Sequence, residues 1–457
     1  MTRHNEIGRM GGLPALPRRV LIALGGALVV AASGCNLLDV SNTNSVSESA
    51  LNNAAAAGPI VRGSRATITR GITSILTSYA TATDELLWVG SRDAYNALDR
   101  GAVGDPFNEF VDASFVYVGE GRFTADGAIE RLIGFGFDTS SRTEDNDLMA
   151  EAYLYGAVIY VNIANMFDDF AFSNKQEAAA NIGPENMVQM FDTAIEYLNN
   201  AESLASDATL RTNILLMRMR AHHDRAVWNM LNPSGVSVTS PMYVNDAAAN
   251  ADAMAALALI GAEDYVFQLD MALDLSDGAV SLGFNVNNRQ EMRFGDRFVF
   301  PTASGKSWDS VAIKDPITNA ASPIVVKIAT EFKDARDLAP LRQASAREAH
   351  LILAEAALAG SGGSFTTHIN DLRALDGLPA FSGQVSDDAM IEHSRATNLF
   401  LGGRRLNDMY RFDVQDVRWQ PDPTVIDALD CPGVLFQITN TERAANPLIT
   451  GQPACSQ

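Results

Sequence analysis

The sequence predicts a mainly α-helical protein that follows an N-terminal export signal. Three observations support this prediction: apolar residues recur at helical spacing, start and stop signals flank these segments, and an apolar stretch lies near the N-terminus. Hydrophobic residues make up 47% of the 457 residues, so the chain can bury a substantial core. We therefore expect a helical scaffold whose weakly patterned segments form loops.

Residues 1–34 are expected to be a lipoprotein signal peptide. Arg18 and Arg19 precede the apolar stretch VLIALGGALVVAA, which is followed by a pair of small residues and then by Cys35. The stretch is too short to span a bilayer, which takes about 20 residues. Small residues that end in cysteine form the bacterial lipobox pattern, so we expect cleavage before Cys35 and lipidation of its thiol. The alternatives are an ordinary signal peptide and an uncleaved anchor.

The mature chain is expected to begin with a tether and to continue as one helical domain. Residues 35–60 are rich in Asn, Ser and Ala and lack a strong periodicity, so we predict a lipidated tether. Helical patterns dominate from about residue 61, and we assign residues 61–457 to the domain. Its clearest predicted helices are 145–167, 184–204, 210–231, 263–280, 345–359 and 386–401.

The predicted helices come as neighbouring pairs of similar length. This arrangement favours stacked helical hairpins of the tetratricopeptide kind, although the consensus of that repeat is not clear in the sequence. Long loops in compact domains are commonly functional. Four stretches have a weak helical signal and are predicted to be such loops: 88–125, 232–260, 282–345 and 412–457.

Charge and motif content argue against several functions. The chain has 34 basic and 55 acidic residues and a net charge of −21, so it repels nucleic acid phosphates and anionic lipid head groups. The nucleophile-elbow and Walker A motifs do not occur, and no GxGxxG occurs in a strand–helix context. Carboxylates are too numerous to nominate one pair as a hydrolase site. We expect no catalysis, no cofactor and no nucleic acid partner.

Two clusters of potential metal ligands are not expected to bind a metal, and the acidic one is interpreted as a solvated helix face. His222 and His223 are adjacent, and adjacent helical side chains point about 100° apart, so one ion cannot easily bind both. Asp270, Asp274 and Asp277 share a predicted helix face, but the loop spacing of a calcium-binding EF-hand is missing. We therefore predict no metal site.

Two cysteines remain near the C-terminus, Cys431 and Cys455. An exported protein with an even number of cysteines commonly pairs them. We therefore predict a disulfide that would close a loop of about 25 residues. The alternative is a pair of free thiols.

Four segments carry a resemblance to a known family through their order and spacing. They are CNLLDVSNTN (35–44), LMAEAYLYGAVIYVNIANMFDDFAF (148–172), REAHLILAEAAL followed by INDLRALDGLPAF (347–381), and HSRATNLFLGGRRLNDMYRF (393–412). Together they resemble the SusD/RagB family of surface lipoproteins, which capture nutrients beside a TonB-dependent channel. Asp168 replaces the Gly of a family Phe-Gly-Asp turn, and Asn398 and Gly402 replace two Glu residues of the C-terminal signature.

The resemblance implies a SusD-like helical scaffold of tetratricopeptide-like helix pairs with long ligand-binding loops and few short strands. It implies no catalysis, and a nutrient-binding domain anchored by lipid at the outer membrane and exposed on the cell surface. The partner would be a SusC-like TonB-dependent transporter, and the ligand an oligosaccharide or, as a second option, a peptide. Alternatives from other classes are a helical-repeat scaffold for a protein partner and a surface glycosidase.

The last of the four segments has a structural role in that family. Arg404, Arg405, Asp408 and Arg411 follow a helix stop and lie among apolar residues. We therefore expect them to form a buried network of arginines and carboxylates, in which guanidinium groups bind carboxylates with two parallel hydrogen bonds.

Aromatic and polar residues of the predicted loops are the candidate ligand contacts. The C–H face of a sugar ring stacks on Trp or Tyr, and its hydroxyls bind Asp, Asn and Arg. The candidates are Trp88, Arg92, Asp93, Tyr95, Asn96, Tyr243, Trp308 and Asp309. For Trp88 and Tyr95, the alternative is a place in the core beside an N-terminal helix.

Overall fold

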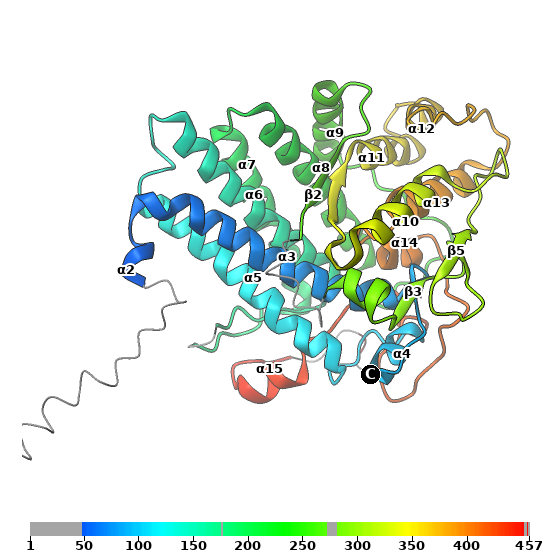
Figure 1. Cartoon of the computed structure of the whole chain (residues 1–457), viewed down its shortest axis with the longest axis horizontal. Helices are drawn as coiled ribbons and strands as arrows, with labels where there is room; N and C mark the ends of the chain where they lie inside the picture. The colour runs from blue at the N-terminus through cyan, green and yellow to red at the C-terminus, as the bar shows by residue number, and fades with distance from the viewer. Residues whose placement is uncertain (1–47, 175–176, 272–280, 452–454, 456–457) are drawn as a thin grey trace, which may run out of the picture. The chain divides into compact units, whose positions relative to one another are not determined.

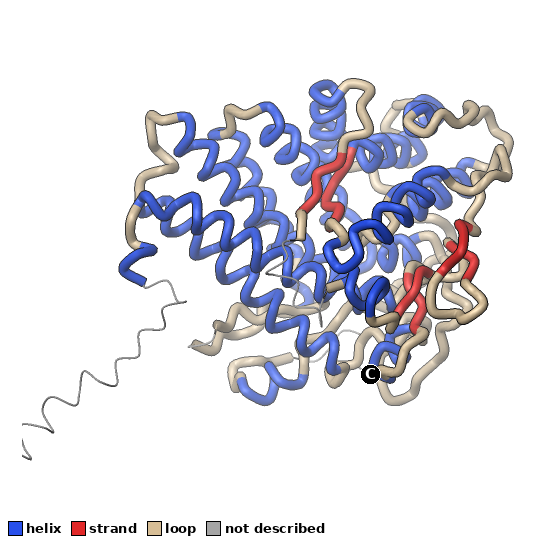
Figure 2. Tube along the Cα trace, in the orientation of Figure 1, coloured by secondary structure: helices blue, strands red, loops and turns tan. Residues whose placement is uncertain are grey.

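The computed structural model describes residues 48–174, 177–271, 281–451 and 455 (Figures 1 and 2). The expected signal peptide, Cys35 and most of the tether lie outside these residues. The chain divides into two compact units, Met1–Asn52 and Asn53–Gln457. Helix α2 (Glu48–Leu51) belongs to the first unit, and everything below concerns the second. No helix in the described ranges is long and apolar enough to cross a membrane.

The N-terminal half of the second unit consists of long helices that pack in sequence order (Figure 1). Helix α6 packs on α7, α7 on α8 and α8 on α9, as expected for stacked hairpins. The first helix begins at Ala57, so the end of the predicted tether is already helical. These elements are η2 (Ala54–Ala56), α3 (Ala57–Thr81), α4 (Asp93–Asp99), α5 (Glu109–Gly134), α6 (Thr143–Met166), η3 (Pro184–Asn186), α7 (Val188–Leu204), α8 (Ala208–Leu231) and α9 (Ala247–Ile260).

Helices α3 and α5 approach each other closely because glycines face the contact. A Cβ atom on Gly71 would lie 2.9 Å from the carbonyl oxygen of Tyr117, and one on Gly121 would lie 3.2 Å from the Cα of Ile68. Helix α6 lies behind this pair, and its side chains from Met149 onward are buried almost without interruption. Helix α6, which corresponds to the predicted helix 145–167, is therefore buried on nearly all of its faces.

The C-terminal half combines shorter helices with irregular segments. Ser345, Ser364 and Ser386 each cap a helix N-terminus through the side-chain oxygen, which accepts a backbone N–H three residues later. The helical elements are the π-helix η4 (Phe284–Asn288), α10 (Pro323–Ala335), η5 (Arg336–Leu338), α11 (Ala346–Leu358), α12 (Phe365–Ala374), α13 (Asp387–Asn398), α14 (Arg405–Arg411) and α15 (Asn440–Ala445).

Strands are few and short, as predicted (Figure 2). The described residues form three antiparallel two-stranded sheets. Two of the sheets pair strands that are distant in sequence, and the third pairs two neighbouring strands. The pairs are β1 (Leu86–Trp88) with β3 (Met292–Phe294), β2 (Val266–Leu269) with β6 (Leu341–Ser345), and β4 (Val299–Pro301) with β5 (Trp308–Val311). The mainly α fold class is therefore confirmed.

All four predicted loops contain helices that sequence periodicity did not indicate. The stretch 88–125 holds α4 and the start of α5, 232–260 holds α9, 282–345 holds α10, and 412–457 holds the short helix α15. Helix α9 is rich in alanine on all sides, and α5 leaves large apolar side chains exposed, so neither has a clean apolar stripe.

The predicted helix over 263–280 is wrong at its start. Residues 266–269 form strand β2, whose side chains alternate between half-buried and buried, the period of a strand. Asp270 lies directly after this strand and forms an ion pair of 3.6 Å with Arg65 at the surface. Asp274 and Asp277 lie outside the described residues.

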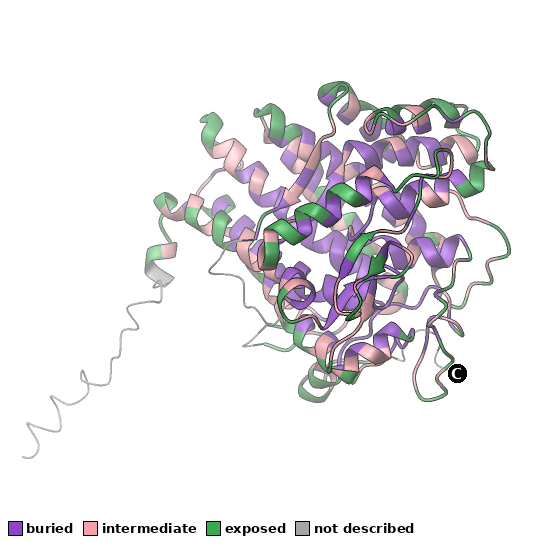
Figure 3. Ribbon diagram, turned by 45° about the vertical axis from the view of Figure 1, so that its right-hand side comes forward, coloured by how far each residue is buried: buried purple, intermediate pink, exposed green. Residues whose placement is uncertain are grey.

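Two clusters of buried apolar side chains form the core. Figure 3 shows that buried residues concentrate in the interior of the helical scaffold. The larger cluster runs through the helices from α3 to α9 and continues under the sheets. The smaller one fills the space between α11, α12 and α13, where Leu351, Ile369 and Met390 are buried. Exposed residues lie on the outer faces of the helices and at the loop tips.

Candidate functional site

Two regions that are distant in sequence meet at α4. They comprise three segments, which we call the loop cluster: residues 84–99, which include α4, and residues 289–296 and 302–309. Pairing of β1 with β3 joins the first two segments (Figure 1). The third segment joins them through Lys306, whose ammonium group donates a hydrogen bond to the carbonyl oxygen of Val89. The structure thus brings seven of the eight candidate ligand contacts into one region.

Glu291 holds the turn that presents Arg92 and Asp93. Its buried carboxylate accepts hydrogen bonds from the backbone N–H groups of Ser91, at 2.9 Å, and Arg92, at 3.1 Å. Burial would raise the pKa of Glu291, but these hydrogen bonds and the guanidinium of Arg289 outweigh it and lower the pKa. The charged carboxylate therefore fixes the backbone of the turn, and the side chain of Asp93 is exposed.

Tyr95 supports the loop cluster from inside. Its side chain is 3% exposed, and its ring stacks on Phe110 with centroids 3.7 Å apart and planes 5° apart. The guanidinium of Arg92 lies 5.2 Å from the centroid of the same Phe110 ring. Burial raises the pKa of Tyr95 above its ordinary value. Tyr95 therefore has the environment of a core residue, whereas its neighbour Asn96 is half-buried.

Trp308 also lies inside, whereas Trp88 keeps part of its ring accessible. Trp308 is 4% exposed, and Asp309 beside it is exposed. Trp88 is half-buried, and its indole Nε1 is buried without a hydrogen-bond partner among the described residues. The backbone N–H of Trp88 donates to Asp99 at 3.3 Å. Trp88 is thus the candidate indole that retains a surface for stacking.

Tyr243 packs in another part of the protein. Its hydroxyl donates a hydrogen bond of 2.6 Å to Asp388, and its ring lies 6.0 Å from that of Phe412. These contacts place Tyr243 against the smaller hydrophobic cluster. The structure therefore does not group it with the other candidates.

Sequence reasoning did not select Phe107, which is 72% exposed beside the loop cluster. The neighbouring Asn108 donates a side-chain hydrogen bond of 2.8 Å to the carbonyl oxygen of Ala94 and also caps α5. Phe107 is therefore held next to α4. The sequence signal for an exposed Phe107 was its position directly before an N-cap asparagine, which places it outside the helix.

A cavity of about 520 Å³ lies between α5, the segment after α6, and α15, and we call it the α5 cavity. Its volume falls in the range of small-molecule sites, about 300–1,000 Å³. Val116 and Phe123 on its rim are 52% and 50% exposed. The lining combines aromatic, small and polar residues: Phe115, Val116, Gly119, Glu120, Phe123, Thr124, Ala171, Ser173, Asn174 and Glu442. Sequence reasoning missed this cavity because it assigned the first half of α5 to a loop.

The expected buried network of arginines and carboxylates is present. Glu355 accepts hydrogen bonds from both Arg411 and Arg395, and these two guanidiniums also bind Asp408, each at 2.9 Å. Burial would raise the pKa of Glu355, but the two arginines hold it well below its ordinary value. Because the network is buried, it serves the scaffold and offers no surface to a ligand.

The same network reaches back to the start of the loop cluster. Arg405 binds Asp84 with two hydrogen bonds of 2.7 Å. Arg404 forms a 3.2 Å ion pair with Glu348 on α11. The C-terminal segment therefore fixes the position of the chain directly before β1.

Solved structures share this arrangement of helices. A SusD-like carbohydrate binding protein from Bacteroides vulgatus matches with a TM-score of 0.58 and 12% identity, over 86% of this chain and 97% of that chain. A laminarin binding SusD-like protein matches with a TM-score of 0.56 and 13% identity, over 88% and 99%. A SusD superfamily protein from Bacteroides fragilis matches with a TM-score of 0.59 and 14% identity, over 87% and 99%. The chain has the SusD-like fold. No family model and no curated protein sequence matches it.

The residues that depart from the SusD-like sequence pattern have defined roles in this SusD-like fold. Asn398 accepts a hydrogen bond of 2.8 Å from Arg347, and the carbonyl oxygen of Gly402 accepts one of 3.2 Å from Arg220. Asp168 is buried and accepts a hydrogen bond of 2.9 Å from Gln437, and burial raises its pKa well above the ordinary value. All three residues therefore take part in hydrogen bonds within the scaffold.

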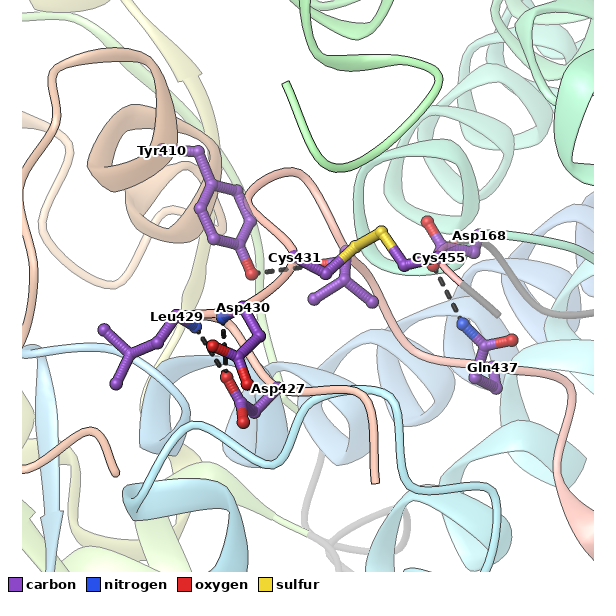
Figure 4. Close-up of a disulfide and its surroundings, with 9 residues drawn as sticks. Asp168, Tyr410, Asp427, Leu429, Asp430, Cys431, Gln437 and Cys455 are labelled. Atoms are coloured by element: carbon purple, nitrogen blue, oxygen red, sulfur yellow. Dashed lines mark hydrogen bonds between the residues drawn. A yellow bond between two sulfur atoms is a disulfide. The ribbon is translucent and has the colours of Figure 1, made fainter. Parts of the chain in front are cut away.

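The expected disulfide between Cys431 and Cys455 is present, with Cα atoms 6.2 Å apart (Figure 4). Around it, the hydroxyl of Tyr410 donates to the carbonyl oxygen of Val434 at 2.9 Å. Asp427 accepts the backbone N–H groups of the two residues before Cys431. The C-terminal segment of the SusD-like fold is thus tied both to itself and to α14.

Proposed function

We propose that this protein is a surface lipoprotein that binds an oligosaccharide and delivers it to a SusC-like TonB-dependent transporter, without catalysing a reaction. The main support is the SusD-like fold, which extends over 97% or more of the solved chains described above. Two of those proteins carry the descriptions carbohydrate binding and laminarin binding. Lipidation of Cys35 would hold the protein in the plane of the outer membrane, where tethering raises the ligand concentration at the transporter.

We place the oligosaccharide at the loop cluster. Trp88 offers a partly accessible indole, and donors and acceptors for sugar hydroxyls lie in the same cluster on Arg92, Asp93, Asn96 and Asp309. The backbone of the loop cluster is ordered before a ligand arrives, because the hydrogen bonds of Glu291 and the stacked aromatic rings below the cluster hold it in place. This order lowers the conformational entropy lost on binding.

We place the transporter contact at the α5 cavity. Val116 and Phe123 expose large apolar side chains on its rim, and such exposed apolar groups next to a concavity are typical of protein contacts. The side chain of a transporter loop could enter the cavity between them. A stable complex buries about 1,600 Å² or more, so neighbouring helix faces would take part.

Glycan binding by the purified full chain in detergent tests the ligand. We expect calorimetric binding of at least one oligosaccharide, with Trp88→Ala and Asn96→Ala weakening it and Phe123→Ala leaving it unchanged. Loss of binding in Phe123→Ala alone would move the glycan to the α5 cavity. Binding of peptides and of no glycan by a correctly folded chain would replace oligosaccharide by peptide.

Mild detergent extraction and pull-down through a C-terminal tag test the partner. We expect a TonB-dependent receptor in near-equal amount, with Phe123→Asp reducing its recovery and Trp88→Ala leaving it intact. Repeated recovery of the lipoprotein alone would contradict the transporter role and favour a scaffold function.

A further inference from the structure

Three potential metal ligands meet on the hairpin formed by α11 and α12. His350 lies in α11, and His368 and Asp371 lie three residues apart in α12, so the latter two share one helix face. One ligand atom from each residue lies within 4.8 Å of the other two. The two imidazole centroids are 6.1 Å apart. Both histidines are half-buried, and Asp371 is exposed.

Both imidazoles contain a nitrogen that the protein leaves unsatisfied. The Nδ1 atoms of His350 and His368 are buried and have no hydrogen-bond partner among the described residues. Buried polar atoms are normally paired, so two such nitrogens side by side are unusual. His223 provides the contrast, because both of its ring nitrogens contact carboxylates, Glu355 at 3.2 Å and Asp224 at 3.4 Å.

We propose that His350, His368 and Asp371 bind a divalent transition-metal ion, for which Zn²⁺ is the best chemical match. Two imidazoles and one carboxylate are ligands that Zn²⁺ accepts, whereas Ca²⁺ and Mg²⁺ prefer oxygen ligands alone. Ligand atoms of tetrahedral Zn²⁺ lie about 3.4 Å apart, given bonds of about 2.0–2.2 Å. The three ligand atoms, which lie within 4.8 Å of one another, would therefore have to move closer together when the ion binds, and Asp371 is the exposed member of the three. Solvent would supply the fourth ligand.

The bound ion would link the two helices of the hairpin across the short connection between them. Residues 361–364 in this connection read SGGS. Because the ion would bind the folded hairpin and not an unfolded one, it would raise the thermal midpoint of the protein. This role is separate from glycan capture, since none of the three residues belongs to the loop cluster or the α5 cavity.

Cobalt titration of the untagged full chain in detergent, after treatment with EDTA, tests the proposal. We expect one Co²⁺ per chain with the visible absorption of a tetrahedral site, displacement by Zn²⁺, and no displacement by excess Ca²⁺ or Mg²⁺. His350→Ala and His368→Ala should each weaken binding by at least tenfold, roughly the lower bound for losing even a supporting residue of a metal site. Zn²⁺ should raise the melting temperature of the original chain and not of these variants.

His222→Ala is the matched control, because His222 is half-buried on α8 and outside the cluster. Circular dichroism confirms that each variant is folded before titration. Equal weakening by His222→Ala and His368→Ala would overturn the proposal. The proposal would also be overturned if the original chain bound Co²⁺ no more tightly than a double variant with His350→Ala and His368→Ala.

Discussion

Trp308 lies face to face with Phe294, with ring centroids 4.2 Å apart and planes 15° apart. Phe294 belongs to β3, and the ammonium group of Lys333 on α10 lies 4.6 Å from the centroid of the Trp308 ring. Two other segments, β3 and α10, therefore cover the indole. The rim of the loop cluster is polar, whereas its base is a set of buried aromatic rings.

We expect Trp308→Ala to destabilise the protein by about 3–5 kcal/mol, the usual cost of truncating a large buried aromatic side chain. Asp309→Ala should change the free energy of unfolding by less than about 0.5 kcal/mol, because Asp309 is exposed. Urea denaturation followed by fluorescence measures both. If Trp308→Ala kept full stability and lost only glycan binding, the indole would be a ligand contact in solution.

Two glycines of the α3–α5 region should respond in opposite directions to the same substitution. Gly71→Ala should destabilise the protein, because the new Cβ meets the backbone of Tyr117. Gly127→Ala should stabilise it by about 0.5–1 kcal/mol, because a Cβ there meets no atom within 4 Å and alanine favours a helix. Thermal melting of the two variants separates them. Melting temperatures that shift in the same direction would contradict the close helix contact.

Arg411→Leu should cost about 3–5 kcal/mol of folding free energy, because it leaves the buried carboxylates of Glu355 and Asp408 with one arginine between them. Arg142→Leu is the control, since this arginine is exposed and its two ion pairs are both 3.9 Å long. Equilibrium denaturation at pH 7 gives both values. A small effect of Arg411→Leu would mean that the network relaxes or takes up a proton.

Stability should fall as the pH rises from about 5 to about 8. Burial raises the pKa of Glu85 to about 8, from an ordinary value of 4.5, so the folded chain keeps a proton that the unfolded chain releases over this interval. One such group lowers the free energy of unfolding by up to about 1.4 kcal/mol per pH unit. Burial raises the pKa of Glu348 to about 7, which adds a slope of the same sign.

Glu85→Gln tests the origin of this slope, because glutamine cannot ionise and can still accept the hydrogen bond from the backbone N–H of Leu401. We expect denaturation midpoints of the variant to vary less between pH 5 and 8 than those of the original chain. Below about pH 4 both chains should lose stability, since the arginines hold the pKa of Glu355 below its ordinary value. An unchanged slope in Glu85→Gln would assign the effect to other groups.

Sequence periodicity predicted helices in which the apolar residues either form a single stripe or cover all faces. Helices α6, α7, α8, α11 and α13 lie close to their predicted bounds. Helix α5 was not predicted, because Val116 and Phe123 interrupt its polar face. Strand β2 looked helical in isolation, and its conformation depends on pairing with β6, which lies more than 70 residues later. Local periodicity carries no information about such a partner.

The sequence located the region of the candidate site but not the exposure of its residues. Tyr95 is buried because Phe110 stacks on it, and Trp308 because Phe294 and Lys333 cover it. These partners come from other segments, so composition alone could not separate buried rings from accessible ones. The same limit applies to His350 and His368, which only the α11–α12 hairpin brings together.

The hydrogen bonds between Asp84 and Arg405 connect residues that are 321 positions apart. A growing or partly translocated chain would contain Asp84 long before Arg405 became available, and a buried carboxylate without its arginine is strongly unfavourable. The N-terminal helices are therefore expected to gain little folding free energy if they assemble around Asp84 before Arg405 is present. Folding should be a late, all-or-none event that waits for the C-terminal segment, and a chain truncated before residue 405 should stay open and sensitive to proteases.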